Sequence, residues 1–117
     1  MAEGARAQRR TGGGRVPAGA SVTVLRGFYE GLELPIESDW FVIGRGRTAD
    51  AVLAEPTISR AHAAIGWTEE QGFFVEDLGS TNGTLVNGQR NDHAKLADGD
   101  EIQIGKLRLQ VSLPPGR

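Results

Sequence analysis

Short apolar or alternating segments recur along the chain from Ser21 onward, and turn-forming Gly, Asp, Asn and Pro residues separate them. Each segment has the length of a β-strand and is rich in Val, Ile, Leu or Phe, which favour half-buried pleated positions. The 3.6-residue period of an amphipathic helix is sustained nowhere. The pattern therefore predicts an all-β domain, with strands expected at residues 22–25, 32–36, 40–43, 51–53, 61–67, 73–78, 84–86, 101–104 and 107–111.

Turn signals indicate how some of these strands connect. Asn87-Gly88 predicts a two-residue hairpin, because both residues accept a positive φ. Asp98-Gly99 predicts a turn before the next strand, and Pro114-Pro115 ends the last strand because proline cannot extend a hydrogen-bonded ladder. About ten short strands at this spacing are typical of a two-sheet antiparallel β-sandwich.

The two ends of the chain differ from the middle. Residues 1–20 are small, polar and rich in Gly and Arg, and such a segment cannot bury enough apolar surface to order itself. We therefore predict a flexible tail at residues 1–20, one sandwich domain at residues 21–113 and a short C-terminal tail at residues 114–117. A length of 117 residues suits a single domain.

Charge is distributed unevenly along the sequence. Residues 1–15 hold four Arg and one Glu, a net charge of +3, whereas the remaining residues hold nine Lys or Arg and fourteen Asp or Glu, a net charge of −5. The predicted domain is therefore acidic and its tail basic. An acidic body lacks the positive face that nucleic-acid binding needs, so we do not expect a nucleic-acid partner.

Cysteine is absent, which excludes a disulfide scaffold, a thiolate metal site and a cysteine nucleophile. No apolar run approaches the length of a membrane span, and the first twenty residues lack the apolar core of a signal peptide. We therefore expect a soluble, cytoplasmic protein without membrane association. We also expect a monomer that uses neither a metal nor another cofactor.

Three predicted loops carry an unusual set of hydrogen-bond donors. They cover residues 44–47, 57–62 and 79–84, and they combine three Arg with hydroxyls, one Asn amide and several Gly. None of the three contains an acidic residue. Because Arg offers a planar fork to phosphate oxygens and Gly lets backbone N–H groups approach a ligand, this combination favours a phosphate monoester.

The same loops belong to a longer ordered pattern. Gly44-Arg45 and Ser59-Arg60-Ala61-His62 are followed by the segments DLGSTNGT at 77–84, VNG at 86–88, LADGD at 96–100 and IG at 104–105. In order and spacing these blocks resemble the signature of the forkhead-associated (FHA) domain family. The resemblance covers roughly residues 21–113. The chain is similar in kind to small stand-alone bacterial members of the family. Several ordered blocks together are far more specific than any one of them.

The resemblance implies an eleven-stranded sandwich whose apical loops bind phosphothreonine peptides. Arg45 matches the arginine that clamps the phosphate, and Ser59 matches the hydroxyl that bonds it. Arg60 stands where the family often has a second phosphate or peptide contact. Thr81 and Asn82 match the loop that bonds the ligand, with Asn82 holding the peptide main chain just after the phosphothreonine.

Other matched residues are implied to support the site. His62 matches a chiefly structural residue that braces the binding loops, and Gly44, Gly79 and Gly83 support the loops through their backbones. Thr57 stands where the family often selects the third residue beyond the phosphothreonine, but it is not the Arg that some members use to favour Asp.

Enzymatic interpretations of the same residues lack a complete set of groups. Ser59 and His62 could suggest a nucleophile and a base, but no third member and no G-x-S-x-G elbow accompany them. Asp98 and Asp100 could suggest a metal pair, but Gly99 between them indicates a turn. Asp77, at the end of a predicted strand, is expected to position the third loop. We therefore expect a protein that is not an enzyme.

Thr11 follows Arg9-Arg10 in the predicted tail and is a candidate phosphorylation site. Similarity to bacterial FHA proteins with phosphorylatable tails implies that this segment could fold back onto the domain's own pocket. A phosphate opposite an Arg cluster can dock a segment in this way.

The sequence thus predicts a phosphothreonine-binding adaptor that acts in Ser/Thr-kinase-linked signalling or assembly. Its expected partners are phosphothreonine-containing proteins, among which a Ser/Thr kinase is one candidate. The alternative is a structural or assembly module that binds unphosphorylated protein through a sheet face. Loss of binding on dephosphorylation would separate the two hypotheses.

Overall fold

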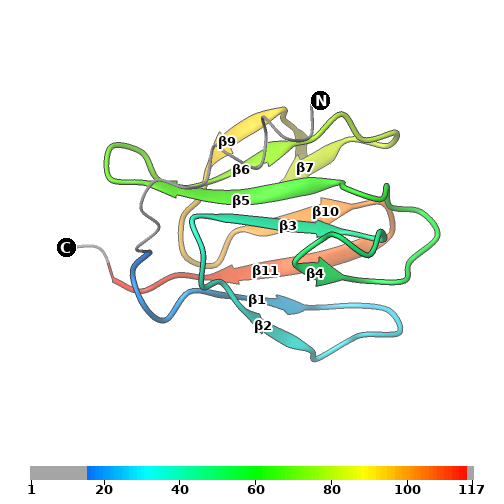
Figure 1. The fold of residues 1–117 in the computed structure, drawn as a ribbon, viewed down its shortest axis with the longest axis horizontal. Helices are drawn as coiled ribbons and strands as arrows, with labels where there is room; N and C mark the ends of the chain where they lie inside the picture. The colour runs from blue at the N-terminus through cyan, green and yellow to red at the C-terminus, as the bar shows by residue number, and fades with distance from the viewer. Residues whose placement is uncertain (1–15, 116–117) are drawn as a thin grey trace.

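The computed structural model describes residues 16–115, which form a sandwich of two β-sheets with eleven strands (Figure 1). The six-stranded sheet has the order β2 (Glu33–Pro35), β1 (Ser21–Val24), β11 (Leu107–Ser112), β10 (Glu101–Ile104), β7 (Thr84–Val86) and β8 (Gln89–Arg90). The five-stranded sheet has the order β4 (Ala51–Val52), β3 (Trp40–Gly44), β5 (Ala63–Thr68), β6 (Gly72–Asp77) and β9 (His93–Lys95). The predicted fold class is confirmed.

The core lies between the two sheets. Alternate residues of β11 are buried at Leu107, Leu109 and Val111 while the residues between them are exposed, so the two-residue period of the strand directs one face inward. Ile102 and Ile104 of the neighbouring strand β10 are also buried, on the same face of the sheet. Full burial of side chains of this size contributes about 1.5–3 kcal/mol each.

One pairing departs from the antiparallel sandwich that the sequence predicts. Strand β4 runs parallel to β3, with Ile43 opposite Ala51. Asp50 makes this possible, because its carboxylate accepts a hydrogen bond from the backbone N–H of Val42 at 2.8 Å while its own N–H donates to the Val42 carbonyl at 2.8 Å. The connecting loop is thereby held against β3.

Strands β8 and β9 were not predicted from the sequence. Their residues are mostly polar, and all are exposed except half-buried Ala94. An edge strand that buries so little has no hydrophobic alternation to reveal it. Strand β8 forms because the Asn87-Gly88 turn folds it back onto β7, with φ values of 50° and 87° at the two turn residues. The predicted hairpin is confirmed.

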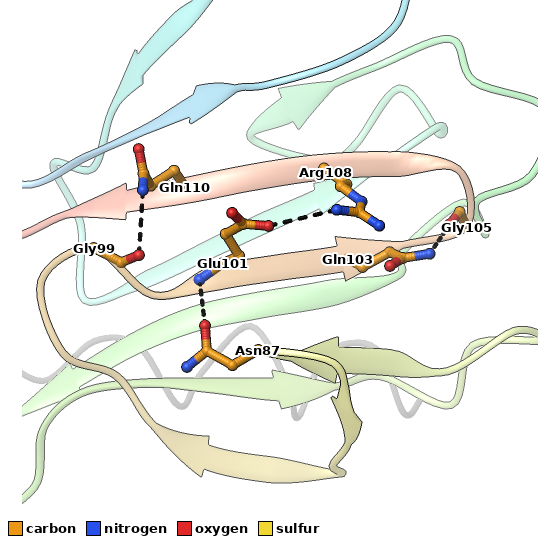
Figure 2. A network of polar contacts seen from close by, with 7 residues as sticks. All are labelled: Asn87, Gly99, Glu101, Gln103, Gly105, Arg108 and Gln110. Atoms are coloured by element: carbon orange, nitrogen blue, oxygen red, sulfur yellow. Dashed lines mark hydrogen bonds and ion pairs between the residues drawn. The ribbon is translucent and has the colours of Figure 1, made fainter.

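The outward face of β10 and β11 is polar (Figure 2). Glu101 and Arg108 form an ion pair at 3.8 Å across the two strands. The backbone N–H of Glu101 donates to the Asn87 side chain at 2.9 Å, and Gln110 donates to the Gly99 carbonyl at 3.3 Å. These polar side chains are therefore partnered by one another or by nearby backbone.

The tail predicted at residues 1–20 lies mostly outside the described residues, as do Thr11 and residues 116–117. Val16 packs against the core, and the Ala20 side chain is 3% exposed. The Ala20 carbonyl accepts a hydrogen bond from the Ile36 N–H at 2.8 Å. Residues 16–115 contain no helix long and apolar enough to cross a membrane.

Several connections gather at one end of the sandwich, on the right of Figure 1. We call this region the loop end. It comprises residues 25–32, 45–50, 53–62, 78–83 and 105–106. The three donor-rich loops predicted from the sequence therefore lie together, although they are separated along the chain.

Candidate functional site

Two glycines allow the first and second loops to lie against each other. A Cβ atom at Gly44 would overlap the carbonyl oxygen of Arg60, and one at Gly46 would come within 3.1 Å of the Arg60 Cβ. The contact is stabilised by backbone hydrogen bonds of 3.0 Å, from Arg45 N–H to the Ser59 carbonyl and from Gly46 N–H to the Arg60 carbonyl. Gly44 is therefore needed for close backbone approach.

The Arg45 side chain is exposed but held in place. Its Nε–H donates to the carbonyl of buried Ile58 at 2.9 Å. The terminal nitrogens of the guanidinium make no hydrogen bond to any residue from 16 to 115. One edge of the planar group is thus fixed by the second loop, and the remaining N–H groups are available to an oxyanion.

His62 joins the second loop to the third from beneath. Its side chain is fully buried, with 0% exposure. The Ser59 N–H donates to Nδ1 at 3.0 Å, and Nε2 lies 2.8 Å from the Gly83 carbonyl. Because Nδ1 accepts, Nε2 must carry the proton and donate, which assigns the neutral tautomer. The imidazole therefore braces both loops and has no nitrogen left to act as a base toward Ser59.

Asp77 organises the third loop, as predicted. One carboxylate oxygen accepts from the N–H groups of Gly79 and Ser80 at 3.0 Å each, and the other accepts from the hydroxyls of Ser80 at 2.6 Å and Thr84 at 2.7 Å. Burial alone would raise the pKa of this carboxyl, but the hydrogen bonds from Ser80, Thr84 and Gly79 outweigh it and lower the pKa below its ordinary value.

Two hydrogen bonds connect the third loop to the second across the surface. The Thr81 N–H donates to the Ser59 hydroxyl oxygen at 3.1 Å, and the Asn82 amide donates to the Thr57 carbonyl at 2.9 Å. The Ser59 hydroxyl proton has no acceptor among residues 16–115. The hydroxyl can therefore donate to an oxyanion without losing its bond from Thr81.

The arginines of the loop end form no ion pair with any described residue. The ion pairs found among the described residues are His93–Glu76 and Arg108–Glu101, and neither includes an arginine of the loop end. Arg45, Arg47 and Arg60 are all exposed. Unpaired guanidinium groups beside hydroxyls and glycines form a surface suited to a doubly charged phosphate.

A comparison with protein-family models matches residues 41–105 to the FHA domain. The chain belongs to the FHA domain family. The matched residues include the first, second and third loops.

Curated relatives give the same assignment. The FHA domain chain is 42% identical over 96 residues to the glycogen accumulation regulator GarA of Mycobacterium tuberculosis, over 82% of this chain and 59% of the relative. It is 40% identical over 100 residues to the oxoglutarate dehydrogenase inhibitor of Corynebacterium efficiens, over 85% of this chain and 70% of the relative. The chain thus spans only about three fifths of GarA.

A solved structure from work on phosphothreonine-dependent FHA domain interactions has the same fold. It aligns with a TM-score of 0.75 and 33% identity, over 82% of this chain and 97% of the other. The fold and the matched blocks therefore agree in placing this chain among FHA domains.

Within this FHA domain, the residues predicted to contact the ligand lie on adjoining loops. Arg45 is on the first loop, Ser59 and Arg60 are on the second, and Thr81 and Asn82 are on the third. The close approach of Gly44 to Arg60 connects the first and second loops, and the bonds from Thr81 to Ser59 and from Asn82 to Thr57 connect the second and third. Their ligand contacts themselves stay predictions.

Thr57 has a different environment from the one expected of a residue that reads the peptide. Its hydroxyl donates to Glu55 Oε2 at 2.7 Å and accepts from the Lys106 N–H at 2.8 Å. A Cβ atom at Gly105 would overlap the Thr57 hydroxyl. Thr57 is therefore a structural link between the second loop and the β10–β11 turn.

Sequence reasoning missed Arg90. This residue of β8 places its guanidinium beside Gly83 of the third loop, where a Cβ atom would lie 2.6 Å from the Arg90 Nε. No signal in the sequence could have found it, because β8 itself was not predicted and a single Arg in a polar segment is ordinary.

Proposed function

We propose that this FHA domain binds phosphothreonine-containing proteins and acts as an adaptor in Ser/Thr-kinase-linked signalling or assembly. The observation that carries the proposal is the state of Arg45. Its Nε is fixed on the Ile58 carbonyl at 2.9 Å and its terminal nitrogens stay available, beside a Ser59 hydroxyl whose proton has no acceptor among residues 16–115. Donors held in place before a ligand arrives lose little conformational entropy when they bind it.

Each proposed contact has a physical basis in the loop end. Arg45 and Arg60 neutralise the phosphate, and the Ser59 hydroxyl donates to one of its oxygens. Thr81 and Asn82 bond the ligand from the third loop, and the Asn82 amide exchanges its bond with the Thr57 carbonyl for the peptide main chain. Gly44, His62, Gly79 and Gly83 hold the three loops at the required spacing.

The relatives support a regulatory role by binding rather than by catalysis. Two of them are named glycogen accumulation regulator and oxoglutarate dehydrogenase inhibitor. By extension, the partners of this chain are proteins phosphorylated on threonine, among which a Ser/Thr kinase is one candidate. The assignment as a non-enzymatic binding module follows from the family.

The outward face of β10 and β11 does not favour the alternative, a structural or assembly module that binds unphosphorylated protein through a sheet face. On that face Glu101, Arg108 and Gln110 are partnered within the domain (Figure 2). A face of this kind offers little apolar area to a partner, whereas the cores of stable interfaces are depleted of charge.

Fluorescence-polarisation titration with a phosphothreonine peptide pool tests the function, with phosphoserine and unphosphorylated pools alongside. We expect saturable binding to the phosphothreonine pool that weakens as salt rises. Arg45→Ala should remove most of this binding, whereas Arg108→Ala, on the sheet face, should keep it. Equal binding to the unphosphorylated pool, or normal binding by Arg45→Ala, would contradict the proposal.

Phosphorylation of Thr11 extends the proposal to regulation. A phosphate there would give the domain a ligand on its own chain, and an intramolecular ligand competes at high effective concentration. Mass spectrometry after co-expression with the host's kinases would detect the modification. If Thr11 is modified, the Thr11→Ala variant should bind the peptide pool more tightly than the modified protein, and equal affinity would exclude self-inhibition.

A further inference from the structure

Arg90 lies directly over the backbone of the third loop. A Cβ atom built on Gly83 would lie 2.6 Å from both Cζ and Nε of Arg90 and 3.0 Å from its Nη2. The guanidinium therefore occupies the space that a side chain at residue 83 would fill. Gly83 has a φ of 83°, so the position favours glycine on backbone grounds as well.

Both sides of this contact are held by other interactions. The Gly83 N–H donates to the Ser80 hydroxyl at 2.9 Å, and the Gly83 carbonyl is bonded by buried His62. Arg90 pairs with Leu85 in the β7–β8 ladder. The guanidinium is thus carried by a residue of the β7–β8 hairpin.

The charge of Arg90 is unpaired within the described part of the chain. The side chain is exposed, and neither of the two ion pairs among residues 16–115 includes it. No hydrogen bond from its guanidinium is found there either. Because Arg90 is exposed, lies beside the third loop and forms no ion pair with a described residue, its guanidinium is available to a ligand that crosses this loop.

Arg90 lies beside the loop that carries two of the proposed ligand contacts, Thr81 and Asn82. Gly83 follows Asn82 directly and stands two residues after Thr81, so the Cα atoms of Thr81 and Gly83 are at most about 7.6 Å apart. A peptide that crosses the third loop at these residues would therefore pass close to the Arg90 guanidinium.

We infer that Arg90 is a specificity-determining residue that binds an acidic side chain, Asp or Glu, close to the phosphothreonine of the partner. This inference rests on the proposed phosphothreonine binding and deepens it. A carboxylate matches the planar guanidinium fork, and the preference for it adds to the phosphate contacts of the first and second loops. The site thus selects a phosphothreonine in an acidic sequence.

A positional scan tests the inference. One phosphothreonine peptide on an alanine background carries a single Glu, moved from three residues before the phosphothreonine to three residues after it. Polarisation titrations would use the wild type, Arg90→Ala, Arg90→Lys and Arg90→Glu. Lys95→Glu is the matched control, because it reverses an exposed charge of the same sign on β9 and leaves the loop end intact.

For the wild type we expect Glu at one or two positions to tighten binding by up to about fivefold, the range of an exposed ion pair. Arg90→Ala should remove this preference, Arg90→Lys should keep part of it, and Arg90→Glu should favour Lys at the same positions. Lys95→Glu should keep the wild-type preference. Every variant should still require the phosphate.

Three results would overturn the inference. One is an unchanged Glu preference in Arg90→Glu, and another is equal loss of the preference in Lys95→Glu. A third is a preference for a second phosphate at those positions without any preference for Glu. In all three cases the wild type still binds phosphothreonine peptides, so the proposed function survives. Failure of the wild type to bind any phosphothreonine peptide would refute the proposed function and this inference together.

Discussion

The loop end and the outward face of β10 and β11 are both polar and exposed, but they use their polar groups differently. On the sheet face, Glu101 pairs with Arg108, and Gln110 and Asn87 bond nearby groups (Figure 2). At the loop end hydrogen bonds hold the three loops together, while the arginines form no ion pair with any described residue. A surface whose polar groups satisfy one another has little to offer a ligand.

The difference also shows where the polar groups of the loop end contribute to stability. His62 and Asp77 fix the loops from inside, through hydrogen bonds to groups of the second and third loops. The exposed cations contribute little to folding and are available for binding. At the loop end, some substitutions should therefore lower mainly the stability and others mainly the phosphopeptide affinity. On the outward face of β10 and β11, substitutions should change neither quantity strongly.

The largest effect should come from His62→Ala. It leaves the Ser59 N–H and the Gly83 carbonyl without their buried partner and creates a cavity, so we expect a loss of about 3 kcal/mol in the free energy of unfolding. Phosphopeptide binding should fall as well, because the second and third loops separate. Urea unfolding followed by tryptophan fluorescence measures the stability. Unchanged stability would show that the loops are held by other contacts.

Arg45→Ala should lower phosphopeptide affinity by about 2–3 kcal/mol, the range of a lost charge-assisted hydrogen bond. Its effect on stability should be below about 1 kcal/mol, because only the bond to the Ile58 carbonyl is lost from an exposed side chain. Calorimetric titration and urea unfolding of the same sample measure the two quantities. If Arg45→Ala lost as much stability as affinity, the proposed difference between the exposed arginines, which bind the ligand, and His62 and Asp77, which stabilise the loops, would be wrong.

Asp77→Asn should destabilise the domain by about 1–2 kcal/mol at neutral pH, because an amide cannot accept all four hydrogen bonds of the carboxylate. The pKa of Asp77 is lowered by folding, so its contribution is present above the ordinary value of 3.8 and is lost as the pH falls through the folded pKa.

Unfolding curves at pH 6 and pH 3 check the sign of this dependence. The wild type should lose more stability between the two pH values than Asp77→Asn does. An equal loss in both proteins would assign the acid sensitivity to other carboxylates.

The smallest effect should follow Glu101→Gln on the sheet face. The ion pair with Arg108 is 3.8 Å long and both side chains are more than 40% exposed, so solvent screens it and the expected change is below about 0.5 kcal/mol. Phosphopeptide affinity should not change. A measurable drop in affinity would show that the two regions are coupled and would break the comparison between them.

Local pattern in the sequence was sufficient to predict the strands that bury a face. Residues 101–104 and 107–111 alternate visibly because one side of each strand must be apolar, and Asn87-Gly88 specifies a hairpin through its positive φ. The same reasoning could not find β8 and β9, whose exposed residues carry no alternation. It also missed the parallel β3–β4 pair, which depends on Asp50 bonding Val42.

For the site, the residue types and their order were present in the sequence, and the resemblance to the FHA signature indicated Arg45, Ser59 and Asn82. Only the tertiary structure decided which polar groups of the loops bond within the domain and which stay available to a ligand. The Thr57 hydroxyl is used by Glu55 and Lys106, whereas Arg90 lies over Gly83 with its charge unpaired among the described residues. Hydrogen bonds and ion pairs between distant segments depend on packing in three dimensions, and local sequence does not specify that packing.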